Sequence, residues 1–135
     1  MPLTIRLPRP LRDRLLQLAN ARPDEEICGL ISGDGVELKR LYPVANIAAD
    51  RTRFFEMDPQ GQIDAMRDMR GRGEAIRAIY HSHPHGPATP SVRDVEHHEY
   101  PDAICLILAA DGAGVFTVSG FHIREGRVVE VGIIE

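Results

Sequence analysis

Two segments of the chain carry apolar residues at the spacing of an α-helix. The first helix is predicted over residues 9–21, where Pro10 suits the first turn and apolar side chains recur at Leu11, Leu15, Leu18 and Ala19. The second should open at Asp58 and Pro59, because Asp58 can cap it and Pro59 can take its first position without losing a hydrogen bond. It is expected to run to about residue 70 and to end at two glycines, Gly71 and Gly73.

Short apolar runs bounded by turn residues predict strands between and after these helices. The predicted strands cover residues 26–32, 36–44, 75–83, 103–109, 114–123 and 127–134, with a further candidate at 52–57. Turn residues separate them at 33–35 and at Glu125-Gly126. A short helix is expected from Ser91. Helices interleaved with strands, followed by a run of strands, predict an α/β fold in which helices pack against one mixed sheet.

Length and composition are those of an ordinary globular protein. The chain has 135 residues, which predicts a single domain over residues 1–135. Hydrophobic residues make up 43% and charged residues 27%, as in soluble domains generally. The net charge of −4 argues against a nucleic-acid-binding protein, which usually carries a basic face.

The cysteines and the N-terminal segment bear on the compartment. Cys28 and Cys105 lie in apolar runs, which predicts buried, reduced thiols. The first residues contain no long apolar stretch with a cleavage pattern, and no apolar run approaches the ~20 residues of a membrane span. These features predict a cytoplasmic protein without a membrane partner.

Metal-capable side chains concentrate between residues 79 and 94, in the stretch IYHSHPHGPATPSVRD. Side chains two apart on a strand point to the same side, so His81 and His83 would present two imidazoles together. Such a pair is a natural half of a tetrahedral zinc site. The alternative is a solvated strand end or a pair of core histidines.

Ser91 and Asp94 follow in the same stretch with the spacing of a helix N-terminus. One interpretation is a capping box, in which Ser91 caps the helix and Asp94 bonds back to it. The other, compatible with the first, makes Asp94 a third metal ligand beside His81 and His83. Two histidines, one aspartate and an open position describe a catalytic site for one Zn²⁺ ion. A general base is then required, and spacing alone does not choose between Glu25 and Glu26.

Other metal-hydrolase patterns fit poorly. The chain lacks HExxH, and its two separate cysteines cannot supply the PCxxC of a zinc deaminase. His85 follows the histidine pair in a loop, where it could line the site. The remaining histidines are expected outside a shared metal site: His97, His98 and His122.

Taken together, these motifs resemble the JAMM metalloprotease family, also called MPN-plus. Its signature is a glutamate, then HSHP, then SxxD, and the chain has EICGL at 26–30, HSHP at 81–84 and SVRD at 91–94. The resemblance implies that His81, His83 and Asp94 are the zinc ligands. It also implies that Glu26, rather than Glu25, is the general acid/base and that Ser91 stabilises the oxyanion. The fold implied is a single mixed, partly barrel-like sheet flanked by helices, with the layered architecture of JAMM proteins and cytidine deaminases.

The resemblance also implies a function. Relatives hydrolyse amide bonds at or after the diglycine tail of ubiquitin-like or sulfur-carrier proteins, so we expect a zinc-dependent peptidase or isopeptidase with such a partner. The segment between Glu26 and His81 is short, without the inserted loops that relatives use to hold ubiquitin, which favours a sulfur carrier. Two alternatives stay open: a non-catalytic, metal-containing interaction module, and a DNA-repair-associated relative.

Overall fold

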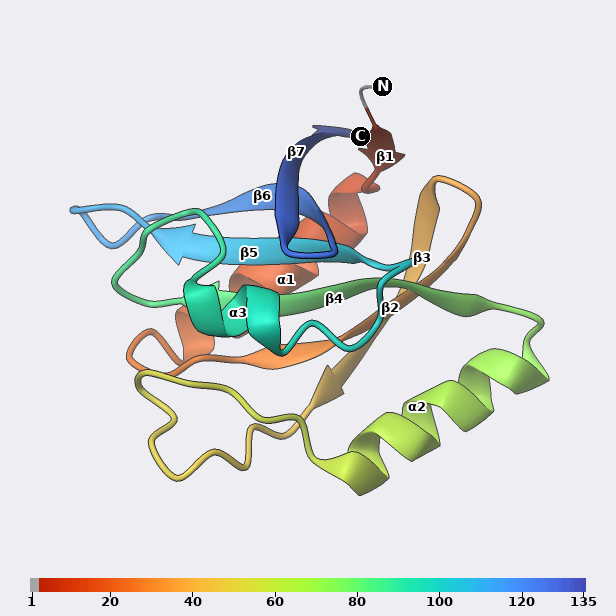
Figure 1. Ribbon diagram of the computed structural model, residues 1–135, viewed down its shortest axis with the longest axis horizontal. Helices are drawn as coiled ribbons and strands as arrows, with labels where there is room; N and C mark the ends of the chain where they lie inside the picture. The colour runs from red at the N-terminus through yellow and green to blue at the C-terminus, as the bar shows by residue number, and fades with distance from the viewer. Residues whose placement is uncertain (1–2) are drawn as a thin grey trace.

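The computed structural model describes residues 3–135, which form strands and helices in one continuous arrangement (Figure 1). In chain order the elements are β1 (Thr4–Arg6), α1 (Arg9–Ala21), β2 (Cys28–Asp34), β3 (Glu37–Val44), α2 (Pro59–Gly71), β4 (Ala75–His83), α3 (Val92–Glu96), β5 (Ile104–Ala110), β6 (Phe116–Arg124) and β7 (Arg127–Ile134). Among these described residues, no helix has the length and apolar character needed to cross a membrane.

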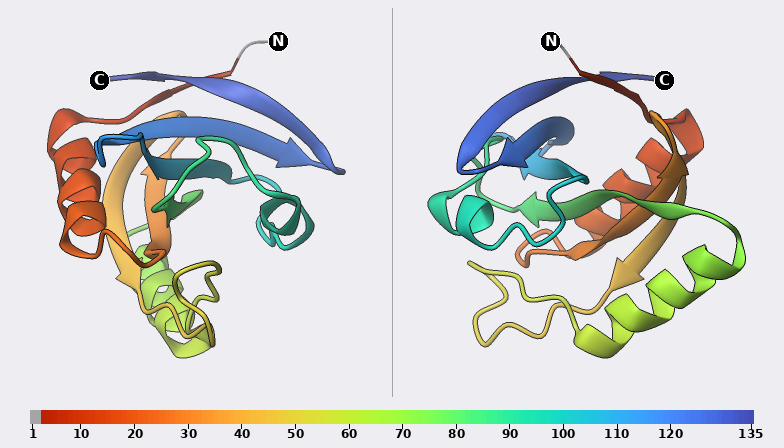
Figure 2. Two further views of the ribbon diagram at one scale, coloured as in Figure 1. Left: turned by 90° about the vertical axis from the view of Figure 1, so that its left-hand side faces the viewer. Right: turned by 45° about the vertical axis from the view of Figure 1, so that its right-hand side comes forward.

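The strands form one mixed sheet that closes on itself in the order β1-β3-β2-β4-β5-β6-β7. Closure depends on the short strand β1, which pairs in parallel with β7 on one side and with β3 on the other. Most other neighbours are antiparallel, but β4 and β5 run parallel. The predicted α/β architecture, with a partly barrel-like sheet flanked by helices, is therefore confirmed (Figure 2).

The two long helices pack on opposite faces of strand β4. Ala78 and Tyr80 join the core cluster that contains Leu15 of α1, whereas Ile79 between them joins the cluster that contains Met69 of α2. This alternation follows from the two-residue period of a strand. His81 and His83 continue the odd-numbered series of Ile79, so both imidazoles are presented on the face away from α1.

Several predicted boundaries agree with the structure. The helix over 9–21 and the strands over 75–83 and 127–134 are found as predicted, and the turn at Glu125-Gly126 has positive φ at both residues. The second helix begins at Pro59 with the Asp58 side chain accepting a hydrogen bond from the amide of Gly61. The strand predicted from residue 26 begins at Cys28 instead, so Glu26 lies just before it.

One predicted strand is absent from the structure, and one strand of the structure was not predicted. Residues 52–57 form a loop with a single bridge, between Asn46 and Met57, rather than a strand. The loop needs no ladder partner because the side chain of Asn46 bonds to its backbone, including the carbonyl of Phe54 and the amide of Glu56. Strand β1 was not predicted, because three residues carry too little pattern and its partners lie far along the chain.

Both cysteines are free and buried, as predicted. Burial raises the pKa of the Cys28 thiol and of the Cys105 thiol to about 12, which disfavours the thiolate at neutral pH. The Cys28 thiol contacts the carbonyl of Val44 at 3.5 Å.

Gly29 of strand β2 provides the first test of this packing. A Cβ at this position would overlap the hydroxyl of Tyr80 and lie 2.5 Å from the carbonyl oxygen of Tyr42, so neighbouring backbone would have to move. We expect Gly29→Ala to lower the free energy of unfolding by about 1–3 kcal/mol, the usual cost of overpacking. Urea unfolding followed by circular dichroism measures this change, because the chain has no tryptophan.

Gly71, the last residue of α2, is the matched control. A Cβ there would meet nothing within 4 Å, so Gly71→Ala should leave stability unchanged or raise it by up to about 1 kcal/mol. Equal stabilities for the two variants would show that the space around Gly29 is not limiting.

Candidate active site

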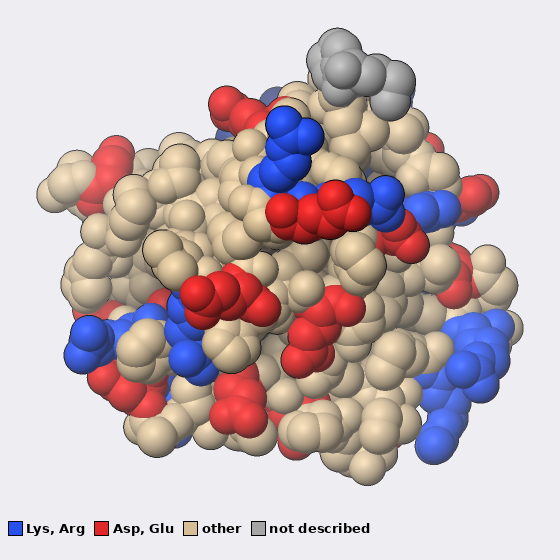
Figure 3. All heavy atoms as spheres, in the orientation of Figure 1, with Lys and Arg blue, Asp and Glu red and all other residues tan. Residues whose placement is uncertain are grey.

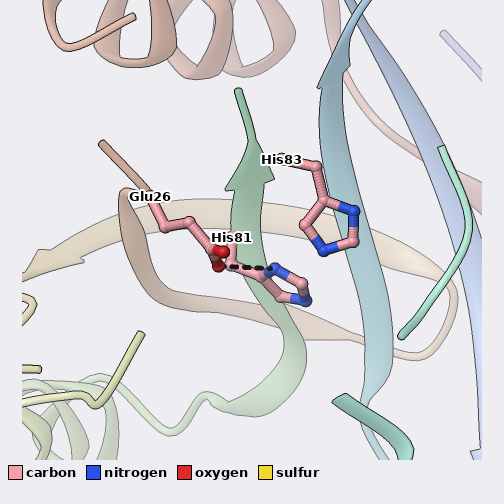
Figure 4. Close-up of side chains that lie close together, drawn as sticks. All are labelled: Glu26, His81 and His83. Carbon is pink, nitrogen blue, oxygen red and sulfur yellow. Dashed lines mark ion pairs between the residues drawn. The ribbon is translucent and has the colours of Figure 1, made fainter. Parts of the chain in front are cut away.

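The site forms where strand β4 ends beside the start of strand β2. Cys28 pairs with His81 in the ladder, so the residue two before Cys28 meets the same end of β4. Glu26 points its carboxylate at the imidazole of His81, with 3.8 Å between Oε1 and Nδ1, and His83 lies on the same side (Figure 4). The potential ligand atoms of Glu26, His81 and His83 all lie within 4.8 Å of one another.

Ser82, between the two histidines, attaches the Glu26 segment to β4. Its hydroxyl accepts a hydrogen bond from the amide of Ile27 at 2.8 Å and donates to the carbonyl of Glu25 at 3.3 Å. The backbone amide of Ser82 in turn donates to the carbonyl of Ile27. The side chain therefore continues the β2–β4 pairing beyond its last ladder residue and places Glu26 opposite His81.

The loop between β3 and α2 closes another side of the site. Asn46 donates through its amide to the carbonyls of Glu26 and Phe54, at 2.8 and 3.0 Å. Its carbonyl oxygen accepts from the amides of Ala48 and Glu56, so all four of its hydrogen-bonding positions are used. This arrangement brings Phe55 over the His81 ring, with 4.4 Å between ring centroids and 20° between planes.

Asp94 reaches the site from α3 on the other side. Ser91 caps α3 through a capping box: its hydroxyl accepts from the amide of Asp94 at 3.0 Å, and its amide donates to Asp94 Oδ2 at 2.8 Å. The same Oδ2 lies 3.0 Å from His83 Nε2, and Oδ1 lies 3.8 Å from His81 Nε2. The capping box predicted from the sequence is thus present, and it directs the carboxylate toward both histidines.

Burial sets the ionisation of the site. It raises the pKa of Glu26 to about 8, against the opposing charge of His83. It also lowers the pKa of His81 to about 4, with the Asp94 charge opposing it. For Asp94, burial acts to raise the pKa, but the hydrogen bond with His83 and the charge of His81 lower it overall to about 2. These buried groups titrate far from their ordinary ranges, as is common at functional sites.

The donor set fits a zinc ion. Two imidazoles and carboxylate oxygens are ligands that Zn²⁺ takes readily. His81 is 1% exposed and its Nδ1 has no hydrogen-bond partner, which is costly for a buried polar atom. His83 has its Nδ1 2.7 Å from the carbonyl of Pro87, an outer contact that fixes the ring and leaves Nε2 facing Asp94. A cation among these groups would also lower the cost of burying Glu26.

A pocket of about 970 Å³ opens over these groups. All five residues predicted for the site line it: Glu26, His81, His83, Ser91 and Asp94. His85 lines it as well, and so do His97 and His98. Glu25 points elsewhere and contacts the guanidinium groups of Arg22 at 3.3 Å and Arg51 at 3.6 Å. Of the two candidate bases, the structure brings Glu26 to the histidines.

Sequence reasoning missed the residues that hold this arrangement. Neither Asn46 nor the stacking of Phe55 on His81 was anticipated, because both depend on a loop that resembled a strand. Arg93, between Ser91 and Asp94, also lines the pocket and lies over the ring of Phe54. The consecutive aromatic residues at 54 and 55 were the available signal in the sequence.

Comparison with known proteins identifies the family of this chain. Residues 8–119 match the family described as prokaryotic homologs of the JAB domain. The chain belongs to this family. This match confirms the expected resemblance to JAB-type proteins. A JAB1/MPN domain protein from Archaeoglobus fulgidus has the same fold. That structure has a TM-score of 0.60 and 19% identity, and the match covers 98% of this chain and 97% of that one.

Other proteins are more similar to this chain in sequence. A desampylase from Haloferax volcanii is 32% identical over 92 residues, which cover 67% of this chain and 66% of the relative. A probable TtuB-protein conjugate cleaving protease from Thermus thermophilus is 30% identical over 133 residues, covering 98% of this chain and 84% of the relative. A solution structure of a protein from Desulfitobacterium hafniense has a TM-score of 0.82 and 34% identity, covering 97% and 92% of the two chains.

In this JAB-family site, the hydrogen bonds of the Ser82 hydroxyl to the Glu26 segment can be tested by mutation. Ser82→Ala leaves the amide of Ile27 without its partner, which should lower the free energy of unfolding by about 1–3 kcal/mol. The amide of Ile27 should also exchange with solvent faster, measured by hydrogen exchange in NMR. Ser119→Ala on β6 is the control, because the side chain of Ser119 has no hydrogen bond among residues 3–135. If both variants behave alike, Ser82 does not hold the Glu26 segment.

Proposed function

We propose that this protein is a zinc-dependent peptidase or isopeptidase that hydrolyses an amide bond at or after the diglycine tail of a ubiquitin-like or sulfur-carrier protein. The observation that carries the proposal is the buried Glu26 carboxylate beside His81 and His83, with Asp94 completing the group in one open pocket. A carboxylate next to a metal-capable group in a pocket suits the general base of a metal-assisted hydrolysis.

In this proposal His81, His83 and Asp94 hold one zinc ion. Zinc there would act as a Lewis acid that polarises the scissile carbonyl and lowers the pKa of the attacking water. Glu26 accepts the proton of that water and passes it to the leaving amine. The hydroxyl of Ser91 accepts from the amide of Asp94, so its own proton is free to donate to the developing oxyanion.

The substrate class is supported by the names of two relatives. One is called a desampylase and the other a protease that cleaves TtuB-protein conjugates, so both names describe cleavage of protein conjugates. Between Glu26 and His81 this chain has only β2, β3, α2 and most of β4, with their connections. With no inserted element in that segment to hold a large folded partner, recognition of an extended tail in the pocket is favoured.

Replacement of Glu26 by glutamine tests the proposed base. Glu26→Gln keeps the size of the side chain but cannot take up a proton, so we expect kcat to fall by roughly 10²–10⁴-fold while the bound zinc stays equimolar with the chain. Turnover assays and elemental analysis of the same preparation give both values. Glu25→Gln is the matched control and should act like the unaltered protein, because Glu25 contacts Arg22 and Arg51 instead of the site. Full activity of Glu26→Gln would assign the base elsewhere.

A panel of ubiquitin-like sulfur carriers tests the substrate. Each carrier would end in Gly-Gly followed by a short extension or by an isopeptide-linked lysine, and products would be measured by intact mass. We expect loss of the group after the second glycine, abolished by a chelator and restored by added zinc. An unchanged mass for every carrier, with zinc bound, would contradict the proposed function.

A further inference from the structure

Two guanidinium groups lie over one aromatic ring at the pocket. The Cζ of Arg93 lies 4.6 Å from the ring centroid of Phe54, and the Cζ of Arg53 lies 5.5 Å from it. Arg53 belongs to the loop between β3 and α2, whereas Arg93 belongs to α3, yet both line the same pocket as Glu26. A flat ring beneath a guanidinium restricts its motion and leaves its N–H groups available to a ligand.

Neither guanidinium has an acidic partner. Among residues 3–135, no carboxylate oxygen lies within 4.0 Å of Arg53 or Arg93, although Arg51 nearby contacts Glu25. On the face seen in Figure 1, acidic side chains are prominent near the centre (Figure 3). Two cations that contact no carboxylate among residues 3–135 can accept an anionic ligand in the pocket that they line.

Their place relative to Glu26 indicates which part of a substrate they would meet. Glu26 must deliver a proton to the leaving amine, so the leaving group lies beside it. Phe55 stacks on His81, whose Nδ1 faces Glu26, and Phe54 is the next residue in the loop. Both cations line the same pocket as Glu26, so a group that they bind lies in one pocket with the leaving amine. In a free α-amino acid the carboxylate is only two bonds from the amine nitrogen.

We infer that Arg53 and Arg93, supported by Phe54, form a subsite for the C-terminal carboxylate of the leaving residue. The inference rests on the proposed function and makes it narrower. It assigns as preferred substrate a sulfur carrier extended beyond Gly-Gly by one residue with a free carboxylate, rather than an isopeptide conjugate. In a conjugate the leaving lysine offers no carboxylate near its ε-amine, because its own carboxyl group lies within a peptide bond.

The chemistry of the step is unchanged by this choice. Hydrolysis breaks the amide C–N bond after the second glycine. The hydroxyl of water adds to the glycine carbonyl carbon, and its proton reaches the amine of the leaving residue. The carrier keeps a Gly-Gly carboxylate, and the released amino acid keeps the carboxylate that the two arginines would bind. A guanidinium can hold such a group through two parallel hydrogen bonds.

The test uses one carrier ending in Gly-Gly-Ala, prepared as the free acid and as the C-terminal amide, with the zinc-loaded protein. We expect kcat/KM for the acid to exceed that for the amide by roughly tenfold to a hundredfold, the effect of one charge-assisted interaction. Arg93→Gln and Arg53→Gln should each reduce this ratio, and together bring it close to one. Arg93→Lys should recover only part of the ratio, because lysine keeps the charge but not the paired geometry.

Arg70→Gln provides the control, since Arg70 lies near the end of α2 outside the pocket. It should retain the full preference for the acid. Zinc content and circular dichroism confirm that each variant is folded. Equal rates for acid and amide with the unaltered protein would overturn this inference while leaving the proposed function intact. If neither form is cleaved and an isopeptide-linked carrier is also left whole, the proposed function fails and the inference fails with it.

Discussion

The hydroxyl of Ser82 joins the two segments on which the site depends. The regular pairing of β2 with β4 reaches Cys28 and His81. Before Cys28 the chain is held by separate bonds, among them those of the Ser82 hydroxyl and of the Asn46 amide. By bonding to the backbone on both sides of Glu26, Ser82 keeps that residue opposite the histidines. A small hydroxyl between two imidazoles thus has a structural role that a larger or apolar side chain could not fill. In the HSHP motif, the side chains of His81 and His83 face the site, and the side chain of Ser82 between them bonds to the backbone of the Glu26 segment.

A second constraint is the cost of collecting ionisable groups where water is largely excluded. Glu26, His81 and His83 are each at most 7% exposed, and burial alone disfavours the charged form of every one of them. Only Asp94 keeps a low pKa, because His83 and the backbone amide of Ser91 bond to its carboxylate. The closed sheet supplies the rigidity that such a group requires, since β4 is paired with β2 as far as His81 and with β5 as far as His83. Such a group of buried ionisable side chains lowers stability, and it is typical of sites that bind a cation or catalyse a reaction.

The sequence predicted the parts that depend on neighbours along the chain. Helix 9–21, strand 75–83 and the cap at Ser91 follow from local spacing, and the histidine pair follows from the two-residue period of a strand. Strand β1 was not predicted, and residues 52–57 were wrongly predicted as a strand. Both structures depend on distant partners: β7 for the strand, and the amide of Asn46 for the loop. The choice of Glu26 over Glu25 came from family resemblance, and its physical basis appeared only when the Ser82 contacts placed one carboxylate inward.

The loop at 52–57 determines part of the surroundings of the site. A regular strand at 52–57 would be tied to a neighbouring strand, and its side chains would follow the pleat. Held instead by one asparagine, the loop brings Phe55 onto a proposed zinc ligand and Phe54 beneath two cations. The motifs before β2, on β4 and at the start of α3 hold the residues of the proposed chemistry, and the loop lines the pocket beside them. Differences in substrate between proteins with the same glutamate, histidines and aspartate should therefore trace to this segment and to the residue that precedes the aspartate.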